Sequence, residues 1–376
     1  MRIGIMMRSA DEAGGIGVYA RNIVEELLKL DQENEYVLFY KTEKHLGRYE
    51  KFANCREIFL PGKNKAVWDQ WKIPRAARKE RVDLIFNPKF TVPLLTRCKT
   101  MMVVHGADWF IPPYDEVYTT IDNFYIKRVM PLYFRRADAI SSVSDYSTDG
   151  FVQAFPWCRD KIKTIYFGPN RIFKRISDRQ ALEAVQTKYN LPQEFILTVI
   201  RYDHGARNTR KNFKGMAEAF SLYKKMGGKE KFVVVGRDCD LYAKEYDLKA
   251  MGIEENVIFT GLVPQVDLPA LYSLARLYLY TTIIEAFPIP TTEAMACGCP
   301  IVTSNGTGLE ELTHGVSLAV DPLDSQAIAE AIDKVLGDEA LQEDMRAKGF
   351  ERSKIFSWEK CAVQTLEIFK QLVRES

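Results

Sequence analysis

Long hydrophobic runs are absent from this sequence, so we do not expect a membrane-spanning protein. The apolar stretch at residues 1–7 is too short for a secretory signal, and no small-residue cleavage site follows it. An excess of one charge is also absent, because the net charge is only +2. The whole molecule is therefore not expected to be a strong binder of polyanions.

A disulfide framework is not expected either. The seven cysteines are scattered and odd in number, which is typical of a reduced, cytoplasmic protein. Cys297 and Cys299 form a C-x-C without a second Cys or His pair nearby, so we interpret them as packing residues rather than zinc ligands. Asp238 and Asp240 form a D-x-D that could hold a divalent metal, but an exposed loop is favoured. We expect no required metal or cofactor.

What the chain does contain is a regular alternation of short apolar runs with amphipathic helical patterns. At 376 residues with 47% hydrophobic content, it is long enough for two domains. A first series predicts strands at 2–7, 36–40, 82–86, 100–104 and 139–143, with helices at 17–30, 67–79 and 122–136. A second predicts strands at 195–200, 231–235, 257–260, 277–280, 300–303 and 317–320, with helices at 212–226, 265–275, 291–297 and 325–336.

Two such series predict an α/β protein built from two Rossmann-like domains that face each other across a cleft. The cluster Gly168-Pro169-Asn170 ends the first series, so we expect domains at 1–170 and 171–356. A last helix is predicted after Phe356, with Ser357 as its N-cap.

The most informative segment is Glu285-Ala-Phe-Pro-Ile-Pro-Thr-Thr-Glu293, with two carboxylates seven residues apart. A helix is predicted to begin between them, and a helix N-terminus attracts phosphate through its unpaired N–H groups and partial positive charge. Carboxylates beside such a site can hold hydroxyl groups, which suits a phosphorylated sugar. The alternative is an ordinary helix start with an acidic first turn.

Three further loops follow predicted strands, where open α/β sheets bind ligands. Gly14-Gly15-Ile16-Gly17 is either a ligand-facing loop or a plain tight turn, and it is not a regular G-x-G-x-x-G. His105 follows the strand 100–104, so a ligand contact is favoured over a purely structural histidine. The basic loop 201–211 contains Arg201 and Lys211, which could stabilise a departing diphosphate, or it is simply solvated.

Residues 63–81 are rich in lysine and arginine, with Trp68 and Trp71 between them. The segment could contact anionic lipid or a phosphorylated acceptor. The favoured interpretation is a solvated helix face with both tryptophans in the core.

The segment Glu285-x7-Glu293, with Ala294-Met-Ala-Cys-Gly-Cys-Pro-Ile-Val-Thr-Ser-Asn305 after it, resembles the donor-site signature of retaining glycosyltransferases of family 4, which have the GT-B fold. The resemblance covers essentially the whole chain. It includes the glycine loop, Val104-His105, Ser142-Val-Ser144, Val320-Asp-Pro-Leu-Asp324 and Phe356-Ser-Trp358. It implies that the last helix, 357–376, crosses back to pack on the N-terminal domain.

The resemblance also implies residue roles in the second domain. Arg201 and Lys211 would contact the donor phosphates, although the loop is longer than usual and leaves the choice between Arg210 and Lys211 open. Glu285 would hold the hydroxyls of the donor sugar, and Glu293 those of the nucleotide ribose. In the N-terminal domain, His105 would touch the donor sugar, while Gly14 and Gly15 would line the phosphate and acceptor side.

One departure concerns the donor contacts. The family usually has Glu-Gly-Phe-Gly where this chain has Glu285-Ala-Phe-Pro288, and proline has no N–H to offer. Phe287 or Ile289 would supply the missing contact, and Thr292 joins the donor-binding set. Around Gly168, the usual Gly-Val-Asp is Gly-Pro-Asn.

The sequence thus predicts a retaining hexosyltransferase that uses a GDP- or UDP-sugar and a saccharide or lipid-linked acceptor, in bacterial polysaccharide or glycolipid synthesis. It would be cytoplasmic, or peripheral at the inner face of the membrane through residues 63–81, and would not bind nucleic acid. The alternatives are a nucleotide-sugar epimerase and a non-catalytic nucleotide-sugar binder. An oxidoreductase would need a regular G-x-G-x-x-G and an acidic residue about 20 positions later, and neither is clear here.

Overall fold

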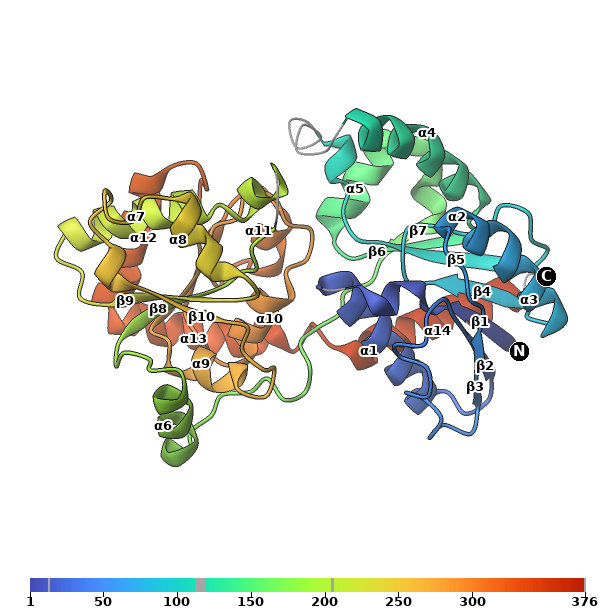
Figure 1. Cartoon of the computed structure of the whole chain (residues 1–376), viewed down its shortest axis with the longest axis horizontal. Coiled ribbons are helices and arrows are strands. Elements are labelled where there is room, and N and C mark those ends of the chain that lie inside the picture. The colour runs from blue at the N-terminus through green and yellow to red at the C-terminus, as the bar shows by residue number, and fades with distance from the viewer. Residues whose placement is uncertain (13, 112–119, 204–205, 375–376) are drawn as a thin grey trace. The chain divides into compact units, whose positions relative to one another are not determined.

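The structure is a computed structural model that describes residues 1–12, 14–111, 120–203 and 206–374 (Figure 1). The chain divides into two compact units. The first comprises Met1–Phe167 and Ser357–Ser376, and the second Gly168–Phe356. The division thus falls beside the Gly-Pro-Asn cluster at which the sequence analysis places the domain boundary.

The first unit is built on a parallel sheet with the strand order β3-β2-β1-β4-β5-β6-β7 among the described residues. Its strands are β1 Arg2–Met6, β2 Glu35–Tyr40, β3 Cys55–Phe59, β4 Leu84–Asn87, β5 Lys99–Val104, β6 Ala139–Ser142 and β7 Ile162–Thr164. The inner strands are buried on both faces, as parallel sheets require. Sequence order reverses between β1 and β4, so this is the switch point of the sheet.

Helices cover this sheet (Figure 1). They are α1 Gly15–Leu30, α2 Lys65–Val67, α3 Ile73–Lys79, α4 Thr120–Arg136, α5 Asp145–Ala154 and α14 Trp358–Arg374. Shorter turns are η1 Met7–Asp11, η3 Asp108–Phe110, η5 Pro156–Lys161 and the π-helical η2 Trp68–Lys72. The C-terminal helix α14 packs against α1. The predicted N-cap is confirmed, because Ser357 Oγ accepts the N–H of Lys360 at 3.0 Å.

The second unit has a parallel sheet with the order β10-β9-β8-β11-β12-β13 in its described part. The strands are β8 Phe195–Val199, β9 Lys231–Val235, β10 Val257–Gly261, β11 Leu277–Tyr280, β12 Ile301–Ser304 and β13 Leu318–Val320. The helices are α6 Arg179–Lys188, α7 Phe213–Lys225, α8 Tyr242–Glu245, α9 Leu268–Leu274, α10 Ile289–Ala296, α11 Gly308–Leu312, α12 Ser325–Gly337 and α13 Glu339–Ser353, with η6 Ala206–Lys211, η7 Cys239–Leu241 and η8 Glu254–Asn256. Its switch point lies between β8 and β11.

The predicted alternation is confirmed, but two strands of the first unit were not predicted. Both β3 and β7 are edge strands, with partly exposed residues and charged side chains such as Arg56 and Lys163. They lack the apolar run that marks a buried strand. Helices α5, α6 and α13 were also not predicted; α6 has no buried residue, and α13 buries only Gln342, Met345 and Gly349, so neither of these two has a strong apolar stripe.

The expectation that both tryptophans of segment 63–81 lie in the core is wrong for Trp71. Trp68 is fully buried and donates its indole N–H to the carbonyl of Leu60 at 2.6 Å. Trp71 is 57% exposed, and the guanidinium of Arg75 lies 4.6 Å from its ring centroid. The predicted single helix is divided by the π-helical η2, whose wider turn changes which side chains face inward.

Candidate functional site

The basic loop 201–211 and Glu285 follow two adjacent strands of the second unit. Strand β8 leads to Arg201 and then to η6, whose last residue is Lys211, while β11 leads to Glu285. Because β8 and β11 are parallel neighbours at the switch point, both loops leave the same edge of the sheet.

Lys211 and Glu285 form an ion pair across these two loops. Their side chains are 14% and 20% exposed, so the pair is partly shielded from water. The hydroxyl of Tyr280, the last residue of β11, lies 3.4 Å from both the Lys211 ammonium and a Glu285 carboxylate oxygen. The sequence named Lys211 and Glu285 separately, and the structure brings them together.

Backbone and side-chain hydrogen bonds hold the two loops together on either side of this pair. The N–H of Ile283 donates to the carbonyl of Arg210 at 2.9 Å. The amide of Asn212 donates to the carbonyl of Thr281 at 2.8 Å and to that of Pro322 at 2.7 Å. Residues 210–212 therefore run beside residues 281–285, and Lys211 is positioned opposite Glu285.

The charge state of Glu285 is set by these cations. Burial by itself would raise the pKa of the Glu285 carboxyl, but the nearby positive charges outweigh it and hold the pKa below its ordinary value. Lys211 contributes most, followed by Arg210 and then Arg201. Lys211 thus makes the direct contact, while Arg210 adds its charge. Arg201 also pairs with Asp203 at 2.7 Å.

A helix does begin between the two carboxylates. It is α10, with Pro288 at its N-cap and Pro290 within its first turn. Neither proline has an N–H, so an anion at this helix start could be bound only by other amides, such as that of Ile289. The hydroxyl of Thr292 donates to the carbonyl of Ile289 at 2.7 Å.

Glu293 lies in a different environment from Glu285. It is 5% exposed and accepts a hydrogen bond from the hydroxyl of Tyr272 at 3.1 Å. Burial raises the pKa of Glu293 to about 8, since the single hydrogen bond from Tyr272 offsets only part of the desolvation. The carboxyl is therefore largely neutral near pH 7, whereas Glu285 is ionised.

The turn between Glu285 and α10 is fixed by a residue that the sequence analysis did not single out. The N–H of Gly308, at the start of α11, donates to the carbonyl of Glu285 at 3.1 Å. A Cβ at Gly308 would collide with the carbonyl of Ala286, so only glycine fits here. The ring of Phe287 packs edge-on against Phe356 with centroids 5.7 Å apart. The sequence feature that could have pointed to Gly308 is a glycine at the start of a helix.

In the first unit, His105 follows β5 and contacts Pro88, just after β4, and Tyr19 of α1. Its Nε2 lies 2.8 Å from the carbonyl of Pro88 and donates to it, because a carbonyl can only accept. The ring makes an edge contact with Tyr19, with centroids 5.0 Å apart. Burial lowers the pKa of His105 to about 4, so the ring is neutral at physiological pH and its Nδ1 is an acceptor.

The glycine loop lies at the start of α1. Gly14 is the N-cap and has a φ of +93°, a conformation that favours glycine. A Cβ at Gly15 would meet no atom within 4 Å, whereas one at Gly17 would collide with the carbonyl of Glu12. Gly17 therefore serves close packing, whereas Gly15 has open space beside it.

Two ion pairs of the first unit were not predicted, and both lie near its switch point. Lys89, just after β4, binds both carboxylate oxygens of Glu12. Arg8, just after β1, pairs with the buried Asp69 at 2.9 Å. The sequence feature that could have predicted these ion pairs is the presence of charged residues directly after two adjacent strands.

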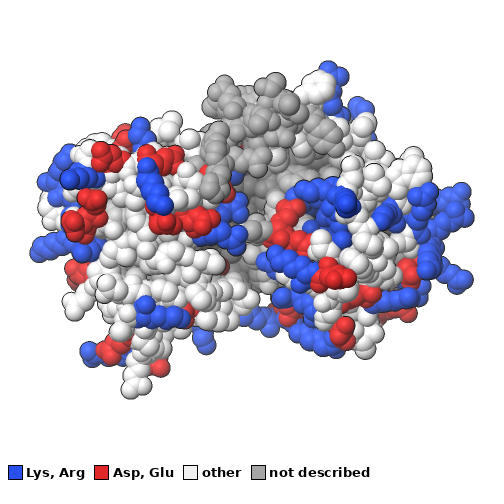
Figure 2. Space-filling model, viewed as in Figure 1, with Lys and Arg blue, Asp and Glu red and all other residues white. Residues whose placement is uncertain are grey.

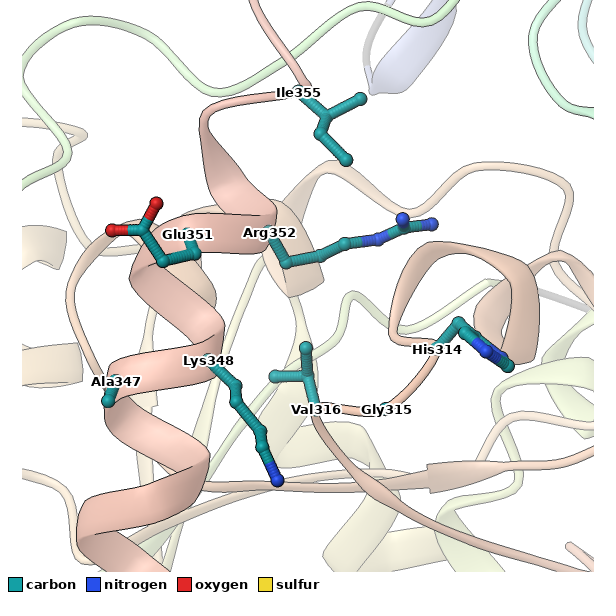
Figure 3. Close-up of a pocket in the computed structure, with 8 residues that line it drawn as sticks. All are labelled: His314, Gly315, Val316, Ala347, Lys348, Glu351, Arg352 and Ile355. Carbon is teal, nitrogen blue, oxygen red and sulfur yellow. The ribbon is translucent and has the colours of Figure 1, made fainter.

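A hollow of about 500 Å³ lies elsewhere on the second unit (Figure 3). Its lining residues are His314, Gly315, Val316, Ala347, Lys348, Glu351, Arg352 and Ile355, and none belongs to the predicted site. Arg352 donates to the carbonyls of Leu312 at 3.0 Å and Glu311 at 2.7 Å. Its role is therefore to hold the end of α11.

Within the described ranges, no group of three or more His, Cys, Asp and Glu side chains could hold a metal ion. Cys297 and Cys299 are buried free thiols, and Asp238 lies in a left-handed turn after β9. No helix in the described part of the chain is long and apolar enough to cross a bilayer.

Comparison with known sequences gives matches along both units. Residues 13–170 match the family described as "Glycosyltransferase Family 4", and residues 185–352 match "Glycosyl transferases group 1". The chain is 32% identical over 388 residues to "O-antigen chain mannosyltransferase B" of Escherichia coli, covering 95% of this chain and 96% of that relative.

Solved structures share the fold. A sucrose-phosphate synthase from Thermosynechococcus elongatus is similar over the full length of both chains, with a TM-score of 0.77 at 20% identity. Anabaena Alr3699/HepE in complex with UDP-glucose has a TM-score of 0.76 at 19% identity, covering 99% of this chain and 100% of that one. At these identities the likeness concerns the fold.

Proposed function

The chain belongs to glycosyltransferase family 4, and on this premise we propose that it transfers a mannosyl residue from a nucleotide-diphosphate donor to a saccharide hydroxyl, with retention of the anomeric configuration. Family membership makes it a glycosyltransferase, and the expected GT-B fold is confirmed. The Escherichia coli relative supports mannose as the sugar and polysaccharide synthesis as the setting.

The observation that carries the proposal is the Lys211–Glu285 pair with two arginines close by. In the transfer, the bond from the anomeric carbon to the diphosphate breaks, and a bond to the acceptor oxygen forms on the same face. The acceptor proton passes to the departing phosphate oxygen. Lys211 and Arg201 would stabilise the charge that develops on the diphosphate, which is usually the largest contribution in such reactions. Glu285 would hold hydroxyls of the sugar.

We assign the remaining roles by the same resemblance. Glu293 would bind the ribose hydroxyls, and its neutral carboxyl can both donate and accept hydrogen bonds there. Phe287, Ile289 and Thr292 would line the donor, with Ile289 supplying an N–H that Pro288 cannot. In the first unit, Nδ1 of His105 would accept a hydrogen bond from a sugar hydroxyl, and Gly14 and Gly15 would allow close approach of phosphate or acceptor.

We also propose that the reaction needs no metal, since Lys211 and the two arginines provide the positive charge that a divalent ion supplies elsewhere.

The identity of the donor nucleotide is tested by thermal unfolding with GDP, UDP or ADP. A ligand that binds only the native state raises its stability in proportion to the logarithm of ligand excess. UDP has the support of the Anabaena structure, whereas GDP is the form in which we expect mannose to be carried.

The central test is Lys211→Ala, assayed for mannosyl transfer with saturating donor and acceptor. Loss of one such contact removes about 3 kcal/mol of transition-state stabilisation, so turnover should fall roughly a hundredfold. Lys214→Ala is the matched control, because Lys214 is an exposed lysine on α7 that pairs with Glu218 at 3.6 Å. Near-normal turnover of Lys211→Ala would overturn the assignment.

Product analysis separates this function from its alternatives. A transferase consumes donor much faster when an acceptor is present and forms a new glycoside. An epimerase would convert the donor without an acceptor, and a non-catalytic binder would leave it intact.

A further inference from the structure

We propose that Tyr280 is a positioning residue whose hydroxyl takes over the carboxylate of Glu285 when a bound diphosphate draws Lys211 away. In the structure, the ammonium of Lys211 is paired with Glu285. Under the proposed function, on which this inference rests, the same ammonium would contact the donor phosphates. Lys211 therefore has two anionic partners, and Glu285 needs another hydrogen-bond donor once Lys211 has left it.

The three polar groups already lie together. The ammonium of Lys211 donates to the hydroxyl of Tyr280 at 3.4 Å, and that hydroxyl donates to Oε1 of Glu285 at 3.4 Å. The same oxygen is in direct contact with the ammonium. Hydrogen bonds between a hydroxyl and an oxygen are usually about 2.7 Å long, so the bond from Tyr280 is a loose one. The tight contact is thus the ion pair, and the hydroxyl lies beside it at a distance that can shorten.

Tyr280 is anchored in the sheet, whereas the two charged residues are not. It is the last residue of β11, which lies between β8 and β12, and its backbone pairs with Thr303. Its side chain is buried, and its ring stacks on that of Tyr278 with centroids 5.6 Å apart. Lys211 ends η6, and Glu285 follows β11. A hydroxyl fixed by a central strand can therefore hold Glu285 in place while the lysine changes its partner.

Glu285 needs a hydrogen-bond donor in both states. Its side chain is only 20% exposed, and a shielded carboxylate that loses its partner carries a desolvation penalty. That penalty would weaken the binding of a diphosphate, because binding would have to break the ion pair. The hydroxyl of Tyr280 removes the penalty. Burial raises the pKa of Tyr280 well above its ordinary value, so the hydroxyl keeps its proton and can donate it in a hydrogen bond.

Positive charge is not concentrated on the outer surface of the second unit that Figure 2 shows. Lysine and arginine side chains there are interspersed with aspartate and glutamate. A diphosphate would therefore depend on the cations of the loop 201–211, and Lys211 is among them. Competition between Glu285 and the diphosphate for this ammonium would then affect donor affinity directly, and Tyr280 would lessen that competition.

The test is the affinity for GDP, measured by isothermal titration calorimetry on the whole chain, with UDP instead if thermal unfolding selects UDP. Tyr280→Phe keeps the buried ring and removes only the hydroxyl. We expect it to bind GDP about tenfold more weakly, the effect of losing one hydrogen bond to a charged group. Its urea unfolding midpoint should stay close to that of the unchanged protein, because Lys211 and Glu285 still satisfy each other.

Tyr278→Phe is the matched control. It makes the same substitution two residues earlier on the same strand and removes another buried hydroxyl. Within the described part of the chain, the Tyr278 hydroxyl has no hydrogen bond to Lys211 or Glu285. This variant should bind GDP as the unchanged protein does.

Double variants separate the exchange of partners from a structural role. In Glu285→Gln no carboxylate needs a new partner, and in Lys211→Ala no ammonium changes its partner. Adding Tyr280→Phe to either background should therefore alter GDP affinity by less than about twofold. A purely structural tyrosine would lower the affinity equally in every background. Glu285→Gln alone should bind GDP at least as tightly as the unchanged protein, because Lys211 then has no competing carboxylate.

The outcomes distinguish this inference from the proposed function. Normal GDP affinity of Tyr280→Phe overturns the inference, and so does an equal loss in the Glu285→Gln background. If the unchanged protein binds neither GDP nor UDP, the inference and the proposed function are both wrong. The expected pattern of affinities in a protein that transfers no mannose would support the exchange of partners and refute the transfer.

Discussion

Asn212 is predicted to position Lys211, and replacing it should separate positioning from stability. Asn212 is buried and has a left-handed backbone conformation, with φ +53° and ψ +35°. Both hydrogens of its amide nitrogen are directed to carbonyls, one at Thr281 and one at Pro322. Because Lys211 is the preceding residue, these two bonds fix the backbone from which its ammonium reaches Glu285.

The two informative variants are Asn212→Gly and Asn212→Ala. Glycine tolerates the left-handed conformation, so Asn212→Gly loses only the two hydrogen bonds, at about 1 kcal/mol each. We expect its free energy of unfolding to fall by about 2 kcal/mol. Asn212→Ala loses the same bonds and adds roughly 1 kcal/mol of backbone strain, so it should be the less stable variant.

Turnover should fall about tenfold in Asn212→Gly, because a reacting group misplaced by about 1 Å can cost up to a hundredfold. Urea unfolding and steady-state kinetics are measured on the same preparations. Gly215→Ala is a second way to disturb the same contact without replacing Asn212: its Cβ would lie 2.6 Å from Asn212 Oδ1 and displace the amide, so turnover should fall in this variant too. If Asn212→Gly is destabilised but keeps normal turnover, Asn212 is a structural residue only. Equal stability of the Gly and Ala variants would refute the strain argument.

Two further predictions concern titratable groups whose pKa values are shifted by desolvation. Unfolded Glu293 loses its proton above about pH 4.5, whereas the folded residue keeps it to about pH 8, so the free energy of unfolding should fall as pH rises through this window. Glu293→Gln removes this pH dependence. Its free energy of unfolding, measured with urea, should exceed that of the unchanged protein by on the order of 4 kcal/mol at pH 8, with almost no difference at pH 4.5. His105 should titrate near pH 4 in its imidazole NMR signals, and stability should decline as pH falls from about 6.5 toward 4, because only the unfolded chain takes up that proton. An imidazole midpoint near 6.5 would contradict the desolvated, neutral ring.

The buried strands and most amphipathic helices could be predicted from sequence because their apolar periodicity is strong. Strand β11 occupies the predicted residues 277–280, and α10 begins between the two glutamates as expected. The edge strands β3 and β7 could not be predicted, since an edge strand has no need of a continuous apolar run. The exposure of Trp71 could not be predicted either, because it depends on the π-helical turn in η2.

The candidate site was predictable as a set of residues and not as a set of contacts. The resemblance names Lys211 and Glu285, but their contact requires β8 to lie beside β11, which is a property of strand order. Gly308 is a similar case, because the collision that excludes a side chain involves the carbonyl of Ala286, far away in sequence. Local sequence patterns do not predict such contacts between loops that are distant in sequence.

Glu285 and Glu293 lie in one short segment but in opposite electrostatic environments, which under the proposed function gives them different roles. Both are shielded from water, yet cations hold the pKa of Glu285 below its ordinary value, while burial raises that of Glu293 to about 8. Environments that move two carboxyls in opposite directions assign them different tasks. Glu285 is an ionised acceptor whose charge is balanced by Lys211. Under the proposed function, this pair would hold Lys211 in place for a diphosphate, and the neutral Glu293 would add no negative charge there. A second ionised carboxylate in the segment would oppose the binding that the cations favour.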